Sequence, residues 1–246
     1  MRVSTAEPMK VESRVQTGDR ALMSKLDPRV APAYTVAEAA RYLRIPLATV
    51  RSWVVGRTYP RRSGKARFSP VISLPEGDGS LLSFHSLIEL AALRALRTEH
   101  EFKLSAVREA LDYAQRKLKV RGLLASRDLL QGPGALFLER YGQLINLNRA
   151  GQLGIKAVLE GLLKRIDWEG GLPVRFFPLL PNRAEARTIV IDPRVAFGKP
   201  TIERLGVKTS VIVDRVNAGE SPEDLAKDYG ATRDEIMDAL AYERAA

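Results

Sequence analysis

Two short helical patterns separated by a three-residue break constrain the fold of this chain more than any other feature. Thr35 is a good N-cap, and Glu38 three residues later completes a capping box, so a helix is predicted to begin here. Pro46 disfavours helix at the residue before it, which ends the first pattern, and a second helix is predicted directly afterwards. The apolar positions follow helical spacing in both segments: Val36, Ala39, Ala40 and Leu43, then Leu47, Val50, Trp53 and Val54. The segment from Thr35 to Val55 therefore predicts a helix-turn-helix.

The residue types in this motif favour a helix pair that enters the major groove of duplex DNA. Small Ala39 and Ala40 allow the two helices to approach closely, and Trp53 is predicted to fill the core between them rather than to stack on bases. The second helix of such a pair presents its early residues to base edges. The predicted base contacts are Thr49, Arg51 and Ser52. Arg51 suits a bidentate pair with guanine, and its alternative role is that of a solvated surface charge.

The basic charge of the chain is concentrated at this motif. The net charge is +10, and residues 33–75 carry eight basic side chains against Glu38 alone, which gives +7. Such a cluster gains affinity for nucleic acid by releasing condensed counterions. The predicted phosphate contacts are Thr35, Arg57, Arg61, Arg62, Lys65 and Arg67. For Thr35 capping is the first role, and the basic stretch could instead be an ordinary exposed loop on a soluble surface.

The predicted fold is mainly α with short β hairpins, in four segments. Residues 1–32 are expected to be a flexible tail, and 33–121 a winged helix-turn-helix domain whose wing strands span 67–74 and 80–84, followed by helices around 87–96 and 107–114. Residues 122–187 are predicted to form a small α+β module. Its expected elements are a hairpin within 136–148, a helix over 155–166 and a strand over 174–179.

The last segment, 188–246, predicts a second helix-turn-helix after a strand at 188–191 and a helix from about Thr209. Ser221 followed by Pro222 is a strong helix start, and Thr232 caps a final helix. The segment carries eight basic and eleven acidic residues, which gives −3. Because this charge opposes DNA binding, protein contact or dimerisation is the favoured role of this module.

Several classes of protein are disfavoured by the sequence. There is no cysteine for disulfides or thiolate zinc sites, and neither a signal peptide nor a membrane span is recognisable, so the cytoplasm is expected. A proline interrupts the phosphate-loop-like run of 198–201, and neither histidine, His85 or His100, lies in a zinc-protease pattern. No catalytic residue, metal or cofactor is predicted, and the chain is expected not to be an enzyme.

Residues 34–118, with their paired helices, wing and two following helices, resemble the DNA-binding head of MerR-type regulators. They lack that family's long dimerisation coiled coil and cysteine metal sensor. Residues 189–242 resemble the domain-of-unknown-function family 433, although Glu203 to Val207 replaces an Arg-Gly-Thr-Arg-like stretch of that family. The runs that carry this second resemblance are VIDPRV (190–195), GKPTI (198–202), AGESPEDLA (218–226), DYG (228–230) and ALAY (239–242).

Proteins that join these two modules resemble antitoxins, which bind a toxin with a PIN-like nuclease fold and repress their own promoter. This resemblance implies a DNA-binding antitoxin that binds double-stranded DNA and a cognate toxin protein. A homodimer on an inverted repeat is expected, because protein symmetry usually mirrors operator symmetry. Two alternatives stay open: a transcription regulator that senses a small ligand in the middle module, and an adaptor that binds only proteins.

Overall fold

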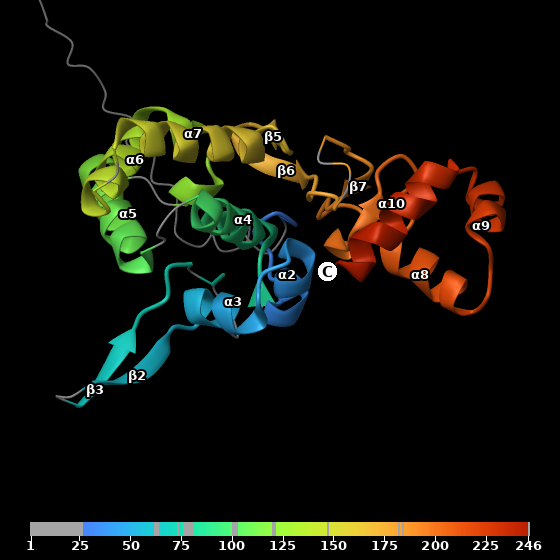
Figure 1. Cartoon of the computed structure of the whole chain (residues 1–246), viewed down its shortest axis with the longest axis horizontal. Coiled ribbons are helices and arrows are strands. Elements are labelled where there is room, and N and C mark those ends of the chain that lie inside the picture. Colours follow the sequence, from blue (N-terminus) through green and yellow to red (C-terminus); the bar gives the residue numbers. More distant parts are fainter. Residues whose placement is uncertain are drawn as a thin grey trace, which may run out of the picture.

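The computed structural model describes residues 27–61, 64–72, 74–75, 81–99, 103–119, 122–146, 148–181, 183 and 185–245. The fold is mainly helical with short antiparallel strand pairs, as the sequence predicts (Figure 1). Two hydrophobic cores organise these residues: a large one that runs from Tyr34 to Phe176 and includes Ile191, and a smaller one between Leu180 and Tyr242. In the described ranges, no helix combines the length and the apolar character that crossing a bilayer requires.

The first helix pair forms as predicted. Strand β1 (Tyr34–Thr35) leads into α2 (Val36–Leu43), and α3 (Leu47–Val54) follows the turn. The Thr35 hydroxyl accepts the Glu38 N–H, and the Glu38 carboxylate accepts the Thr35 N–H at 2.9 Å, which completes the capping box. Arg44 ends α2 in the left-handed region, at φ 51°, where the chain reverses before Pro46.

The wing lies earlier in the chain than the sequence predicts. Strands β2 (Arg57–Arg61) and β3 (Gly64–Phe68) pair with each other, so the hairpin is formed by the basic stretch that begins at Arg57. The predicted pairing of 67–74 with 80–84 is wrong, because β4 (Leu81–Leu82) pairs with β1 instead. That register sets Leu82 opposite Tyr34, and both side chains are fully buried. Burying these two apolar residues together favours the long-range pair over the local one.

Long helices cover the first pair and build the large core. Helices α4 (Phe84–Glu99) and α5 (Leu104–Leu118) are followed by the 3₁₀ turns Leu123–Ala125 and Arg127–Leu130, then α6 (Gly132–Leu144) and α7 (Arg149–Leu163), and the hairpin of β5 (Ile166–Glu169) and β6 (Leu172–Phe176). The predicted hairpin within 136–148 is wrong, because most of it lies in α6. Phe137 and Tyr141 stand four residues apart and stack with ring centroids 6.0 Å apart, so both are buried on one helix face.

The C-terminal segment follows its predicted order. Strand β7 (Ile189–Val190) pairs with β8 (Thr201–Ile202), and α8 (Thr209–Asn217), α9 (Pro222–Tyr229) and α10 (Arg233–Arg244) surround the small core. Ser221 caps α9, and Thr232 with Glu235 forms a capping box on α10. Gly230 ends α9 at φ 61°, which completes the second helix-turn-helix outline. Figure 1 shows these helices on the far side of α2 from the wing.

Glu89 on α4 makes the stability of the large core depend on pH. Its side chain is 14% exposed, and burial raises the pKa of its carboxyl to about 8, while burial lowers the pKa of His85, whose Nδ1 lies 4.0 Å away. In an unfolded chain the carboxyl of Glu89 has its ordinary pKa of 4.5. Between that pH and about 8, only the folded chain therefore keeps the proton. Stability from this group is therefore complete at low pH and is lost as pH rises, by ~1.4 kcal/mol per pH unit.

The variant Glu89→Gln should remove this loss. We expect it to be more stable than the wild type by about 3 kcal/mol at neutral pH, with the difference shrinking as pH falls towards 4.5. Urea unfolding of both proteins across this range measures the difference. A constant difference at every pH would show that Glu89 does not titrate as described.

Candidate nucleic-acid interface

The core of the first helix-turn-helix leaves one face of α3 to solvent. Val50 is 0% exposed and Trp53 3% exposed, and both pack in the large core with the small Ala39 of α2. The open face consists of exposed residues one helical turn apart: Leu47, Ala48, Arg51 and Val55. Trp53 is thus a core residue, as predicted.

The three predicted base-contact residues differ in how freely they can reach a ligand. Arg51 is exposed, and in the described part of the chain it has no ion pair or hydrogen bond from its side chain. Ser52 is half-buried. Thr49 is also half-buried, and its hydroxyl accepts a hydrogen bond from Arg97 Nη1 of α4 at 3.2 Å. Only Arg51 therefore stands fully free to contact a base.

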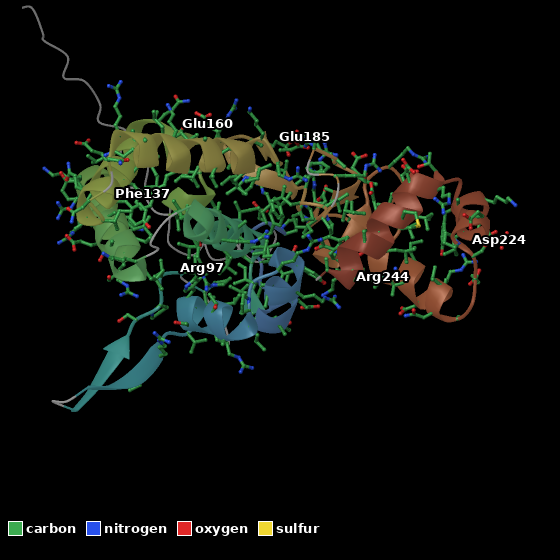
Figure 2. The ribbon with its side chains drawn as sticks, viewed as in Figure 1. Arg97, Phe137, Glu160, Glu185, Asp224 and Arg244 are labelled. Atoms are coloured by element: carbon green, nitrogen blue, oxygen red, sulfur yellow. The ribbon has the colours of Figure 1, made fainter. Side chains whose placement is uncertain are left out.

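Arg97 adds a cation that the sequence analysis did not identify. It is exposed near the end of α4 and lies between α4 and α3 (Figure 2). A helix of leucines and alanines gives no signal that one arginine faces a threonine 48 positions earlier in the sequence. Arg97 places positive charge beside the early residues of α3, where a phosphate contact would supplement base contacts.

The wing extends from the end of α3 and carries much of the basic cluster. Arg57 begins β2 and is exposed, and Arg61 ends the same strand. The register places Lys65 opposite Pro60 and Arg67 opposite Thr58. Arg62, also predicted as a phosphate contact, lies outside the described residues.

The base of the wing is fixed to α3 by its backbone. The Trp53 carbonyl accepts the N–H groups of Val71 and Ile72 at 2.8 and 3.2 Å. The chain leaving the hairpin therefore returns to the end of α3, and Figure 1 shows the hairpin projecting away from the helices. Helix α3 and the wing are thereby presented on one side of the molecule (Figure 1).

Part of the basic cluster faces the C-terminal module instead. The Arg44 guanidinium lies 5.5 Å above the centre of the Tyr242 ring, a cation–π contact. Thr35 is exposed, but its hydroxyl is engaged with Glu38, whose carboxylate forms an ion pair with Lys199. The charge near α2 therefore stabilises the contact between modules, whereas Arg51 on α3 remains exposed to solvent.

The C-terminal module docks on α2 through a tyrosine contact. The Tyr242 hydroxyl donates a hydrogen bond to the Tyr42 carbonyl at 3.2 Å, and the Tyr242 side chain is 0% exposed. Burial raises the pKa of Tyr242 well above its ordinary value, so the hydroxyl keeps its proton and remains a donor. Figure 2 places Arg244, two residues later, where α10 ends near α2.

The second helix-turn-helix offers a poorer surface for DNA than the first. Its acidic side chains are largely paired with arginines, all of them from residues 188–246 except Arg183. These pairs are Arg215 with Glu220 and Asp228, Arg233 with Glu223, Arg204 with Glu235, and Arg183 with Asp234 and Asp238. Arg204, Arg215 and Arg233 are therefore engaged within the module. Across the described residues, histidine and carboxylate side chains form no group able to hold a metal ion.

Comparisons with known proteins match both halves of this architecture. A family model described as "Putative DNA-binding HTH domain" matches residues 32–111, and one described as "Protein of unknown function (DUF433)" matches residues 189–242. The chain is 27% identical to "Uncharacterized protein Rv2308" of Mycobacterium tuberculosis over 91% of this chain and 94% of that protein. The X-ray crystal structure of Rv2018 from the same organism aligns with a TM-score of 0.63 and 27% identity, over 85% of this chain and 98% of that one.

A further relative joins the two halves in one protein. "Putative antitoxin VapB45" of Mycobacterium tuberculosis is 32% identical over 242 residues, which span 91% of this chain and 97% of that protein. Because the match runs through head, middle and C-terminal module, it concerns the whole architecture. The chain carries a helix-turn-helix DNA-binding domain followed by a DUF433 module, and it belongs to the family of the antitoxin-named protein VapB45.

Proposed function

We propose that this chain is a sequence-specific DNA-binding antitoxin of the cytoplasm that represses its own operon and neutralises a cognate toxin with a PIN-like nuclease fold. The observation that carries the DNA-binding part is the free, exposed Arg51 on α3 beside a basic wing. A helix of this kind reads base edges in the major groove while neighbouring cations hold phosphates. The name of its relative supports the antitoxin part.

In this proposal the head is of the MerR type, since α2 and α3 are followed by a hairpin and two helices. Thr49, Arg51 and Ser52 contact bases, and Thr35, Arg57, Arg61, Arg62, Lys65 and Arg67 contact phosphates, joined by Arg97. Residues 33–121 bind DNA, 122–187 connect the modules, and 188–246 contact protein. The chain acts without catalysis or cofactor, and residues 1–32 form a tail.

Two variants separate base reading from phosphate binding. We expect Arg51→Ala to lower discrimination between operator and random duplex by ~1–3 kcal/mol. Arg61→Ala should lower the affinity for both duplexes by the same factor. It should also reduce the slope of log affinity against log salt concentration by about one. Fluorescence anisotropy across a salt series measures both quantities, and Lys117→Ala, an exposed lysine on α5, controls for a lost charge. Equal losses on both duplexes for Arg51→Ala would remove it from the reading role.

The toxin and the dimer need separate tests. Co-expression with the protein encoded beside this chain should restore growth that the partner alone arrests, and the two should copurify. Copurification with no rescue of growth would contradict neutralisation.

Sedimentation of the chain on an inverted-repeat duplex should give two protomers per duplex, whereas one protomer at saturation would contradict a dimer.

A further inference from the structure

A cavity of about 410 Å³ lies where the head and the middle meet, beside the connection that leads to the C-terminal module. Its volume falls within the ~300–1,000 Å³ typical of small-molecule sites. The head contributes residues of α2 and α4 to its lining, and the middle contributes residues of α7 and β6. The connection between β6 and β7 contributes further lining residues, among them Glu185 and Arg187. Figure 2 shows Glu185 of that connection close to the β5–β6 hairpin. The walls are mostly apolar, with Tyr42, Leu43, Leu162 and Phe176 among them.

The charged groups on these walls are predominantly positive. Arg94, Lys164, Arg165 and Arg187 line the cavity against Glu185 alone. Two of the four have structural roles: Arg165 donates to the carbonyls of Phe177, Pro178 and Ala186, at 2.6, 2.7 and 3.0 Å. Arg187 forms an ion pair with Asp167 and lies 3.8 Å above the Phe177 ring. In the described part of the molecule, the side chains of Arg94 and Lys164 have no ion pair or hydrogen bond.

Arg94 lies in surroundings that disfavour an uncompensated cation. It is half-buried on α4, and burial together with the nearby Arg44 lowers its pKa. Arg44 itself has buried Nε and Nη2 atoms without a hydrogen-bond acceptor in the described structure. The two like charges create a positive potential at Arg94, and within the described ranges neither guanidinium forms an ion pair with a carboxylate. A bound anion would relieve it through charge-assisted hydrogen bonds.

We propose that this cavity binds a small amphipathic anion, an apolar body that ends in a carboxylate or phosphate. The body lies against Tyr42, Leu162 and Phe176, and the anionic end lies on Arg94, with Lys164 as a second cation. This site is distinct from the DNA-binding face, because Arg51 and the wing do not line the cavity. The inference therefore goes beyond the proposed function and does not depend on it.

Calorimetric titration of the full chain tests the site with octanoate and octyl phosphate, with octanol as the neutral analogue. We expect saturable binding of at least one of the anions at one site, and at least tenfold weaker binding of octanol. Arg94→Gln should reduce anion affinity at least tenfold, while Arg94→Lys retains part of it. Lys117→Gln, which removes an exposed charge away from the cavity, should leave it unchanged.

A second variant blocks the space without threatening the fold. Gly161 of α7 lines the cavity, and a Cβ added there meets nothing within 4 Å. Gly161→Leu should obstruct part of the cavity and weaken binding, while the higher helix propensity of leucine preserves α7. Binding that survives both Arg94→Gln and Gly161→Leu, equal binding of octanol, or no binding of either anion at millimolar concentration would overturn the proposal.

Discussion

Trp53→Ala is expected to destabilise the head by ~3–5 kcal/mol, the usual loss when a buried tryptophan is truncated in a packed core. The Trp53 side chain is 3% exposed and belongs to the large core, and its carbonyl holds the segment that returns from the wing. Losing the indole therefore loosens α3 and the base of the wing together. The variant should also lose specific binding to the operator duplex. Fluorescence anisotropy measures this binding, and thermal unfolding measures the loss of stability.

Val55→Ala is the matched control for this prediction. Val55 follows α3 directly and is 58% exposed, so its truncation should change stability by less than ~0.5 kcal/mol. If Trp53→Ala folded with wild-type stability, the indole would not be the core contact described here.

Gly198→Ala is expected to have the second largest effect, because it disturbs the junction between head and C-terminal module. Gly198 has φ +73°, which costs an alanine ~1–2 kcal/mol. A Cβ there would lie 2.2 Å from the hydroxyl oxygen of Tyr34, a side chain that is 0% exposed and packs edge-on against Tyr42. Displacing this buried ring lowers the free energy of unfolding by a further ~1–3 kcal/mol. The variant should therefore unfold at a clearly lower urea concentration than the wild type.

Gly206→Ala isolates the contribution of the clash. Gly206 has a similar φ of +66°, but its added Cβ meets only a Val195 methyl at 3.8 Å, an ordinary contact. Both variants change the unfolded chain alike, so their difference reports the overlap with Tyr34. Equal stability of the two variants would contradict the tight junction.

Local signals predicted much of this fold correctly. The capping boxes at Thr35 and Thr232 and the Ser221–Pro222 start fix helix ends through neighbours in the sequence, and the structure has all three. The wing and the 136–148 segment were placed wrongly because their outcome depends on distant partners. Leu82 pairs with Tyr34 rather than with a nearby strand. The glycine after Tyr141 favours a turn in the sequence, whereas in the structure both residues lie within α6 and Tyr141 is buried on one face of that helix.

For the candidate site, the sequence predicted exposed Arg51 and buried Trp53 but not the contacts that surround them. Helical periodicity tells which face of α3 is open, since it follows from neighbours within a turn. It cannot indicate that Arg97 reaches Thr49 or that Arg44 lies over Tyr242. A charge count over 33–75 therefore overstated the cations available to DNA, because it treated residues at the α2 junction as if they faced solvent.

Hydrogen exchange of the full chain, with and without its operator duplex, tests most directly which of the two helix-turn-helix motifs binds DNA. We expect new protection across Leu47–Val54 and the strands of the wing, with α9 and α10 unchanged. Protection confined to Pro222–Arg244, with α3 exchanging as in the free protein, would contradict it.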